Sequence, residues 1–506
     1  MTHRSRIAPT SPKLALAIST FLLLAACGPS GAQGPSRRSL EASRPALRAL
    51  VAELGLEDPR RRAEAACGLE ALGDVAVEAM AALEPLLADE RRVENARVCQ
   101  GGNRFEGGPG RWIYVTSPAA AAAEALARFS PRSTSLLARA MTAASAITRA
   151  HAAWALGEGG DPAGGVTLLS ALDDGEARVR GQAAEALGKL ESDSAAAEIG
   201  ALLTDSDPGV RRAAAEALGE LGAREAAPAV AKLLTDPDRD VRAVAADTLS
   251  EIGGSAAAPA LERALADPDA EVRMEVLAAL SEVDSAAASR AAVAATSDAD
   301  GRVRLEAVQT LSEHSSAGSH AALVKLAGDP DWRVREGVAE ALGESGDARG
   351  RSALREALRD GHSDVRAAAA HSLGDLQNSD DVAVLTEALA DSHFDVREAA
   401  IEALADIGDP RAVTPLAKFL TEGDWRLRAV AVEALGSLES ANSVPALTSA
   451  LEDPHWQVRL AAVEGLGESG DTAAVPALRK LLRDSRAEVR EASVEAVAEL
   501  LEEEEN

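Results

Sequence analysis

An arginine recurs every 31 residues, from Arg149 to Arg490. The residues that could bind a partner lie at fixed distances from this arginine in the sequence. Five positions after that arginine, eight of the twelve units carry an acidic residue. Stacked helices lie about 8–10 Å apart, which is roughly one Debye length in physiological salt, so the potentials of neighbouring carboxylates overlap. Such a row would attract a partner with a basic surface. The alternative is that these glutamates only keep the helix face soluble, which would give the same sequence pattern. We call the members of the later units the acidic row: Glu340, Glu402, Glu433 and Glu464.

Four of the eleven aromatic residues share a second position, three residues before the arginine. Histidines stand beside three of them or at the matching position, at His362, His393 and His455. Because buried aromatic side chains dominate many protein interfaces, these residues are a second candidate for partner binding. The alternative is that each ring packs over the next turn. We call this set the aromatic row: Trp332, Phe394, Trp425 and Trp456.

Motifs for catalysis are not found in the sequence. No cysteine cluster has the spacing of a zinc site, no glycine-rich phosphate loop follows a strand, and there is no Gly-x-Ser-x-Gly. The sequence therefore predicts no catalytic residue, no metal site and no cofactor.

The elements that must position these rows are helices. Apolar residues make up 46% of the chain but aromatic residues only 2%, so Ala, Leu and Val must fill the core. In one unit, an apolar stretch at 229–234 is followed by Asp236 and Pro237, which predict the start of a second helix. A small residue eight positions after the arginine, such as Gly188, predicts the left-handed end of that helix. One such unit cannot bury its apolar face alone, so neighbouring units must stack.

The repeated pattern Asp-Pro-x-x-x-Val-Arg-x-x-Ala-Ala-x-x-Leu-Gly resembles the short HEAT-like repeat, the subclass first associated with phycobilisome lyases. The resemblance covers residues 132–500 and implies an all-α, right-handed α-solenoid. With two degenerate units before residue 132, we expect about fourteen helix-turn-helix units in all. It also implies that the repeated arginine and the acid six positions before it form a structural ladder. The alternative is that the repeated arginines form a continuous row that binds a ligand. The ladder residues include Asp236, Arg242, Asp267, Arg273, Asp329, Arg335, Asp453 and Arg459.

The N-terminus reads as a targeting segment. A basic start and an uncharged run from Leu14 to Ala26 predict a signal peptide over residues 1–26. Leu24-Ala25-Ala26-Cys27 resembles the lipobox of bacterial lipoproteins, which implies a lipid on Cys27. Gly28 in place of an aspartate favours the outer membrane in that family. The alternatives are an ordinary secretory signal and a buried helix. Residues 27–38 then form the lipidated cysteine and a flexible tether.

A net charge of −29 argues against nucleic acid and anionic lipid as partners, so we expect membrane contact through the anchor only. No later stretch reaches 18 apolar residues. Cys67 and Cys99 can form a disulfide in an oxidising compartment; two unpaired buried cysteines are the alternative.

Residues 39–131 are predicted to be degenerate N-terminal units, interrupted by a Gly-rich insert at 92–116 that is either a functional loop or a cap. Residues 132–500 form the regular solenoid and residues 501–506 an acidic tail. We therefore expect a non-enzymatic, lipid-anchored scaffold that binds protein partners in the bacterial cell envelope. A lyase-like enzyme or enzyme chaperone is the alternative, and an architectural envelope component without a dedicated ligand is a second one.

Overall fold

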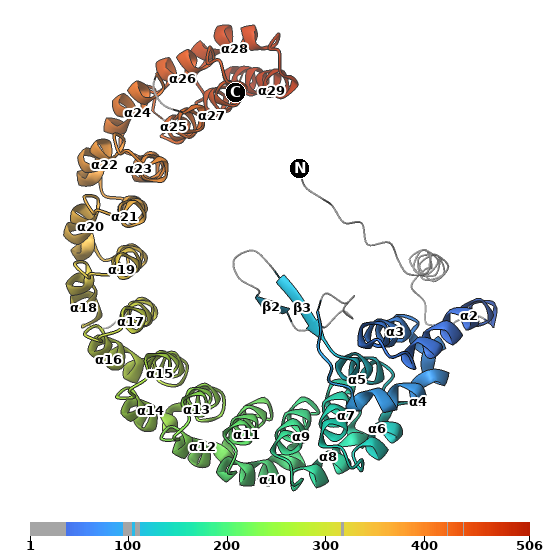
Figure 1. Cartoon of the computed structure of the whole chain (residues 1–506). Helices are drawn as coiled ribbons and strands as arrows, with labels where there is room; N and C mark the ends of the chain where they lie inside the picture. The colour runs from blue at the N-terminus through green and yellow to red at the C-terminus, as the bar shows by residue number, and fades with distance from the viewer. Residues whose placement is uncertain are drawn as a thin grey trace, which may run out of the picture. The chain divides into compact units, whose positions relative to one another are not determined.

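The computed structural model describes residues 37–94, 104–106, 112–314, 318–421, 424–438 and 440–505. It divides into two compact units, Met1–Ala264 and Leu265–Asn506, and each is described by itself. The predicted all-helical solenoid is confirmed: a short helix and a longer one alternate along both units (Figure 1). The handedness and the number of repeats stay predictions.

The helices of the first unit include one short element, α4, that continues into 3-10 turns on both sides. They are α2 (Arg37–Leu54), α3 (Pro59–Ala71), α4 (Met80–Leu83), α5 (Pro118–Arg128), α6 (Thr134–Ala140), α7 (Ala146–Gly159), α8 (Gly165–Ala171), α9 (Ala177–Lys189), α10 (Ala196–Ala201), α11 (Pro208–Glu220), α12 (Ala227–Leu233), α13 (Arg239–Ile252) and α14 (Ala258–Ala264).

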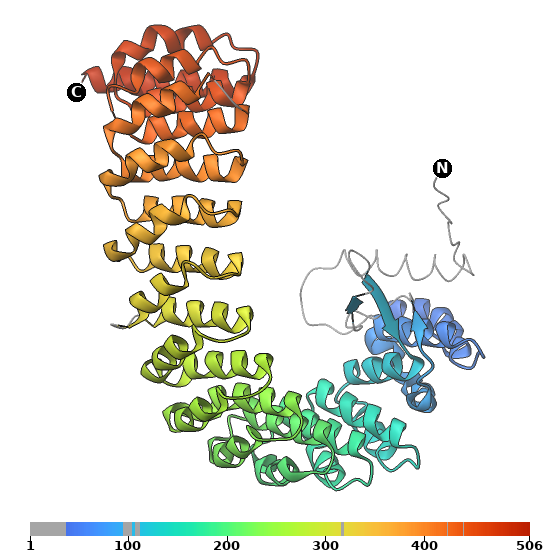
Figure 2. The same ribbon diagram turned by 60° about the vertical axis from the view of Figure 1, so that its left-hand side comes forward.

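In the second unit the odd-numbered helices form one layer and the even-numbered helices the other (Figure 1), and Figure 2 shows the same stack of helices from another side. They are α15 (Ala270–Val283), α16 (Ser285–Ala295), α17 (Gly301–Glu313), α18 (Ser319–Leu326), α19 (Trp332–Glu344), α20 (Arg351–Ala357), α21 (Ser363–Asp375), α22 (Val382–Ala388), α23 (Phe394–Ile407), α24 (Val413–Phe419), α25 (Trp425–Ser437), α26 (Val444–Ala450), α27 (Trp456–Glu468), α28 (Val475–Leu481) and α29 (Ala487–Glu505). The core between the layers is aliphatic: Leu373, Leu385 and Leu404 are fully buried.

The start of each long helix differs from the prediction made for Asp236 and Pro237. Helix α13 begins two residues later, and its N-cap is Asp238, whose carboxylate accepts the backbone N–H groups of Asp240 and Val241. Asp236 instead accepts the N–H of Asp238 at 2.9 Å and shapes the turn before the helix. Both aspartates are residue types that favour caps, so the sequence alone did not separate their roles.

The small residue eight positions after the arginine was wrongly predicted to end the helix in a left-handed conformation. Gly343 lies inside α19, and a Cβ there would meet the Cα of Ser372 on the next long helix at 2.9 Å. The left-handed residue comes three positions later, at Gly346, with a φ of +62°. Gly343 therefore allows close approach of two helices, whereas Gly346 reverses the chain.

The Gly-rich insert contains a small antiparallel sheet, which the sequence did not predict because its strands are short. The strands are β1 (Val93–Glu94), β2 (Arg104–Glu106) and β3 (Trp112–Thr116), in the order β1-β3-β2. Val93 pairs with Thr116, and Phe105 pairs with Ile113.

A candidate acidic protein-binding face

The ladder residues lie at the N-terminal ends of the long helices. In each pair described here, the Nε and Nη2 of the arginine bind the two carboxylate oxygens of the aspartate 25 residues later, in the next turn. The bonded pairs are Arg149 with Asp174, Arg180 with Asp205, Arg211 with Asp236, Arg273 with Asp298, Arg304 with Asp329, Arg335 with Asp360, Arg366 with Asp391, Arg428 with Asp453, and Arg459 with Asp484.

The same arginines bind backward as well. The Nη1 of Arg335 donates to the carbonyl of Asp329 at 2.8 Å, and that of Arg242 donates to the carbonyl of Asp236 at 2.9 Å. The hydrogen bond from Arg335 lowers the pKa of Asp360, and that from Arg366 lowers the pKa of Asp391 to about 2. Each guanidinium thus donates hydrogen bonds to two successive turns of the solenoid. This favours the structural role over the binding of a ligand.

The ladder reaches further into the N-terminal units than the arginine register suggested. Arg62 binds Asp89 through Nε at 2.9 Å and donates from Nη1 to the carbonyl of Leu56, six residues before it, as the regular arginines do. The ladder then breaks at the helix that follows the insert. In α7 the ladder arginine, Arg149, stands four residues after the N-cap Ser145. In α5 the residue four positions after the N-cap Ser117 is Ala121, and Ala143 occupies the position of the aspartate that would bind it.

The aromatic row packs within the chain. Trp332 stacks on His362 of the next turn, with ring centroids 3.8 Å apart, and Trp425 stacks on His455 in the same way. The guanidinium of Arg426 lies 4.8 Å from the ring of Phe394, and that of Arg486 lies 4.4 Å from the ring of Trp456. All four rings are half-buried. These contacts agree with the alternative to partner binding, in which each ring packs over the next turn.

The acidic row lies on the opposite half of the same helices. Glu340, Glu433 and Glu464 are exposed, and Glu402 is half-buried with its carboxylate 3.6 Å from the imidazole of His371. A second line of carboxylates, four residues further along most of these helices but replaced by Ser437 in α25, was missed in the sequence. Its members fold over the preceding unit: the hydroxyl of Ser281 donates to Glu313 at 3.0 Å, and that of Ser312 to Glu344 at 2.6 Å.

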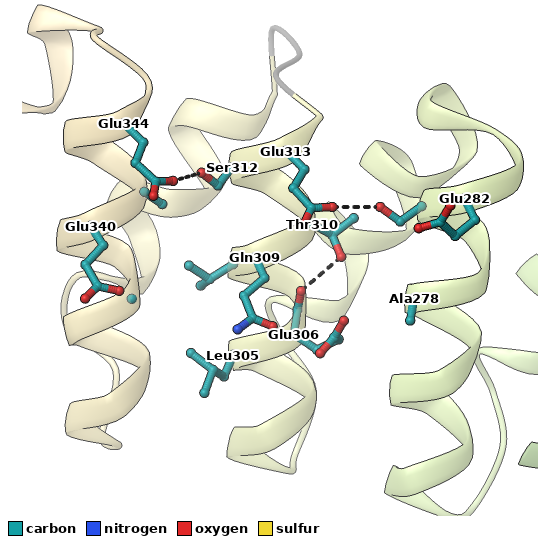
Figure 3. A pocket seen from close by; sticks show the side chains of 14 residues that line it. Ala278, Glu282, Leu305, Glu306, Gln309, Thr310, Ser312, Glu313, Glu340 and Glu344 are labelled. Carbon is teal, nitrogen blue, oxygen red and sulfur yellow. Dashed lines mark hydrogen bonds between the residues drawn. The ribbon is translucent and has the colours of Figure 1, made fainter. Parts of the chain in front are cut away.

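A groove of about 530 Å³ lies where α15, α17 and α19 run side by side (Figure 3). Its floor is apolar, formed by Leu305, Val308 and Ala341 among others. Lysine, arginine and histidine are not among the residues that line it. Its glutamates are Glu282, Glu306, Glu313, Glu340 and Glu344.

The second line of carboxylates, which includes Glu344 and Glu468, stands in the last helical turn, where a helix disfavours an acid. The C-terminal end of a helix carries partial negative charge, so an acid there costs about 0.3–1 kcal/mol and a cation is preferred. Yet no basic residue stands in the last turn of α15, α17, α19, α21, α23, α25 or α27. Although these side chains are exposed, partial desolvation and the neighbouring Glu344 raise the pKa of Glu340. Partial desolvation, Glu464 and Glu402 raise the pKa of Glu433. Helix stability does not account for this arrangement, which leaves a line of unneutralised charge.

One pair beside the groove has the residue types of a hydrolase, because Ser281 Oγ lies 2.5 Å from His314 Nε2. The pair stands at the C-terminal ends of α15 and α17, next to Glu313. A tetrahedral intermediate would need N–H donors at this point, whereas carboxylates and helix C-termini present negative charge. The arrangement is therefore unsuited to acyl transfer.

The remaining predicted residues fall largely outside the described part of the chain. Cys27 and Cys99 lie there, and Cys67 is disulfide-bonded. Within the described residues, no helix is long and apolar enough to cross a membrane, and no group of three His, Cys, Asp or Glu side chains could hold a metal ion.

No curated protein matches the chain. Among similar solved structures, that of Kap121p is 14% identical, with a TM-score of 0.57 over 92% of this chain and 57% of that chain. Importin beta is 15% identical, with a TM-score of 0.55 over 97% of this chain and 72% of that one. Kap95p is 14% identical, with a TM-score of 0.54 over 90% and 66%. The chain thus spans less than two thirds of the Kap121p and Kap95p structures, and the likeness is one of fold.

The family match is more direct. A model described as HEAT repeats matches residues 165–250, 227–298, 289–374, 352–436 and 413–498, which together cover well over half of the chain. The chain belongs to the HEAT repeat family.

Proposed function

We propose that this chain is a non-enzymatic scaffold that binds a protein partner through the acidic row, and that the partner presents a basic segment. The observation that carries the proposal is the row of carboxylates at the C-terminal halves of the long helices, where no basic residue stands in the last turn. Burial first, and then repulsion from Glu464 and Glu402, raises the pKa of Glu433. A cationic segment along this face would offset that repulsion.

Two further observations support protein binding. The groove over α15, α17 and α19 combines an apolar floor with acidic walls, which suits a side chain that is both aliphatic and cationic, such as lysine or arginine. A protein of similar fold, Kap95p, is described as binding RanGDP.

The test is capture from an envelope extract by the full mature chain, followed by identification of the partner. Replacing Glu340, Glu402, Glu433 and Glu464 by Gln should abolish capture, because the row would lose its charge without losing helix propensity. The matched control replaces exposed Glu198, Glu225 and Glu356 by Gln; these residues stand outside the row on short helices or turns, and the variant should leave capture intact. Equal loss in both variants, or in neither, would contradict the proposal.

We also propose that Cys27 carries a lipid and holds the solenoid at the periplasmic side of a bacterial envelope, with the outer membrane favoured by Gly28. The order of basic start, apolar run and lipobox-like residues supports this. Pairing of Cys67 with Cys99 would agree with an oxidising compartment, and the disulfide-bonded state of Cys67 supports it. Mass spectrometry of the mature N-terminus decides the anchor: diacylglycerol on Cys27 is expected, and an unmodified Cys27 would overturn it.

The likeness to lyase-type HEAT-like repeats makes a different prediction. A lyase or its chaperone should carry a chromophore when purified. A visible absorption band in the purified chain would favour that function over the scaffold. If the role is purely architectural, the aromatic row and the acidic row can be changed freely, and only the stability of the repeats is affected.

A further inference from the structure

Within the second unit, the face of α28 and α29 that points away from α27 has no packing partner among the described residues (Figure 1). Val494 is 57% exposed, whereas Val463 at the same position of the preceding unit is fully buried. Leu482 is 38% exposed, whereas Leu451 at the same position is 3% exposed. At the matching positions of the preceding unit, the next unit of the solenoid covers these side chains.

This face also carries basic residues in a chain of strongly negative net charge. Arg479 and Arg483 are exposed, and neither has a carboxylate partner within the described part of the chain. Arg490 is the last ladder arginine. Its Nη1 donates to the carbonyls of Asp484 at 2.8 Å and Ser485 at 3.2 Å.

Arg490 is held like the arginines that bind a carboxylate. The Nη1 of Arg459 donates to the carbonyls of Asp453 at 2.9 Å and Pro454 at 3.3 Å, while its Nε and Nη2 bind Asp484. In Arg490 the backward bonds are made, but the Nε and Nη2 edge has no carboxylate among the described residues. The guanidinium is thus already oriented to receive one.

An internal joint of the same solenoid shows what such a face receives. Exactly four repeats earlier in the register, the same residue types stand at the same positions: Arg355, Leu358, Arg359 and Arg366 match Arg479, Leu482, Arg483 and Arg490. At that joint a small groove of about 230 Å³ forms between α20 and α22, with Leu358 opposite Val384 and Ala388.

The charges across that internal joint are complementary. Arg355 Nε lies 2.5 Å from a carboxylate oxygen of Asp381, which is fully buried. Arg359 lies 3.6 Å from Glu387, and Arg366 binds Asp391 at 2.7 and 2.9 Å. All three carboxylates belong to one segment, residues 378–392, which contains α22 and the turn after it.

We propose that the outer face of α28 and α29 is a docking site for an acidic helix of a partner protein, which presents an apolar stripe and carboxylates at the positions held by Asp381, Glu387 and Asp391 inside the chain. A second copy of this chain fits less well. The ladder-aspartate position before Arg62 is held by Leu56, so the N-terminal units offer Arg490 no carboxylate there. The site is separate from the acidic row, and its failure would leave the proposed function untouched.

The probe that tests this is a fluorescent peptide of residues 378–392, held helical by a cross-link between positions 379 and 383, whose side chains are exposed in the chain. Fluorescence anisotropy with the full chain should show saturable binding. The double variant Arg479→Glu and Arg483→Glu should weaken binding at least tenfold, and Arg490→Ala should weaken it as well. Lys418→Glu, an exposed cation on α24 in the same layer, is the matched control and should leave the affinity unchanged.

The competing occupants are outcomes of the same experiment. A peptide with Asp381→Asn, Glu387→Gln and Asp391→Asn should not bind. No binding of the acidic peptide, or equal binding of its neutral form, would overturn the proposal. Binding of anionic vesicles or single-stranded DNA in place of the peptide, or dimerisation of the chain that the Arg479→Glu and Arg483→Glu variant abolishes, would overturn it too.

Discussion

In the second unit, the charged side chains at the N-terminal ends of the long helices are paired, whereas the carboxylates of the C-terminal halves have no basic residue in the last helical turn. At the N-terminal end, Arg335 and Asp360 bind each other, and Trp332 is covered by His362. At the C-terminal half, Glu340 and its neighbours have no basic residue in the last helical turn. The difference separates charge that holds the solenoid together from charge that is available to a partner.

Removing a ladder arginine should have the largest effect. Arg335→Ala leaves Asp360 largely buried without its partner and frees the carbonyl of Asp329. Breaking such a pair costs about 3–5 kcal/mol. Hydrogen exchange should show faster opening of α19 and α21, and urea denaturation a lower midpoint. Arg333→Ala, at an exposed position two residues away, should change stability by no more than about 0.5 kcal/mol. Equal effects of the two substitutions would contradict the ladder's role.

A methyl group at the helix contact should come next. In Gly374→Ala the new Cβ would lie 2.8 Å from the Cα of Ala403, so α21 and α23 must separate. Overpacking of this kind costs about 1–3 kcal/mol. Gly361 has nothing within 4 Å of a Cβ, and Gly361→Ala should be close to neutral in the same thermal denaturation. A neutral Gly374→Ala would show that the helices do not approach closely.

The two ends should also respond in opposite directions to pH. Burial first, then Glu468, raises the pKa of Glu464 above the ordinary 4.5, so the folded chain takes up a proton before the unfolded chain does. Stability should therefore increase as the pH falls through that raised pKa. The pKa of Asp391 is held at about 2 by Arg366, against an ordinary 3.8, so its stabilisation is lost between about pH 4 and pH 2. Urea midpoints from pH 7 to pH 3 should pass through a maximum. A steady fall from pH 7 would contradict this sign.

Neutralising the acidic row should have the smallest effect on folding, and a favourable one. Glu340→Gln, Glu433→Gln and Glu464→Gln remove negative charge from helix C-terminal halves, which gains a few tenths of a kcal/mol each. Thermal denaturation should show an unchanged or slightly higher midpoint. A clear drop would mean that these carboxylates support the fold and are not reserved for a partner.

The sequence predicted much of this contrast but not its details. The 31-residue spacing of arginine and apolar residues was enough for the helix pairs, since Leu and Ala at helical spacing must face a core. The roles of Asp236 and Asp238, or of Gly343 and Gly346, were not separable, because each pair has the same residue type within a few positions. The partners of Trp332 and Trp425 depend on contacts between turns 30 residues apart. The Arg62–Asp89 pair was hidden because the insert shifts the register.

The central claim is that the acidic row is an electrostatic receptor. Its most direct test is calorimetric titration of the full chain with a 20-residue lysine-rich helical peptide at several salt concentrations. We expect binding that weakens steeply with salt and that is lost when Glu340, Glu402, Glu433 and Glu464 are replaced by Gln. The double substitution Trp332→Ala and Trp425→Ala should leave the binding intact. Binding that survives the glutamine variant, or that is lost in the tryptophan variant with its helicity preserved, would contradict it.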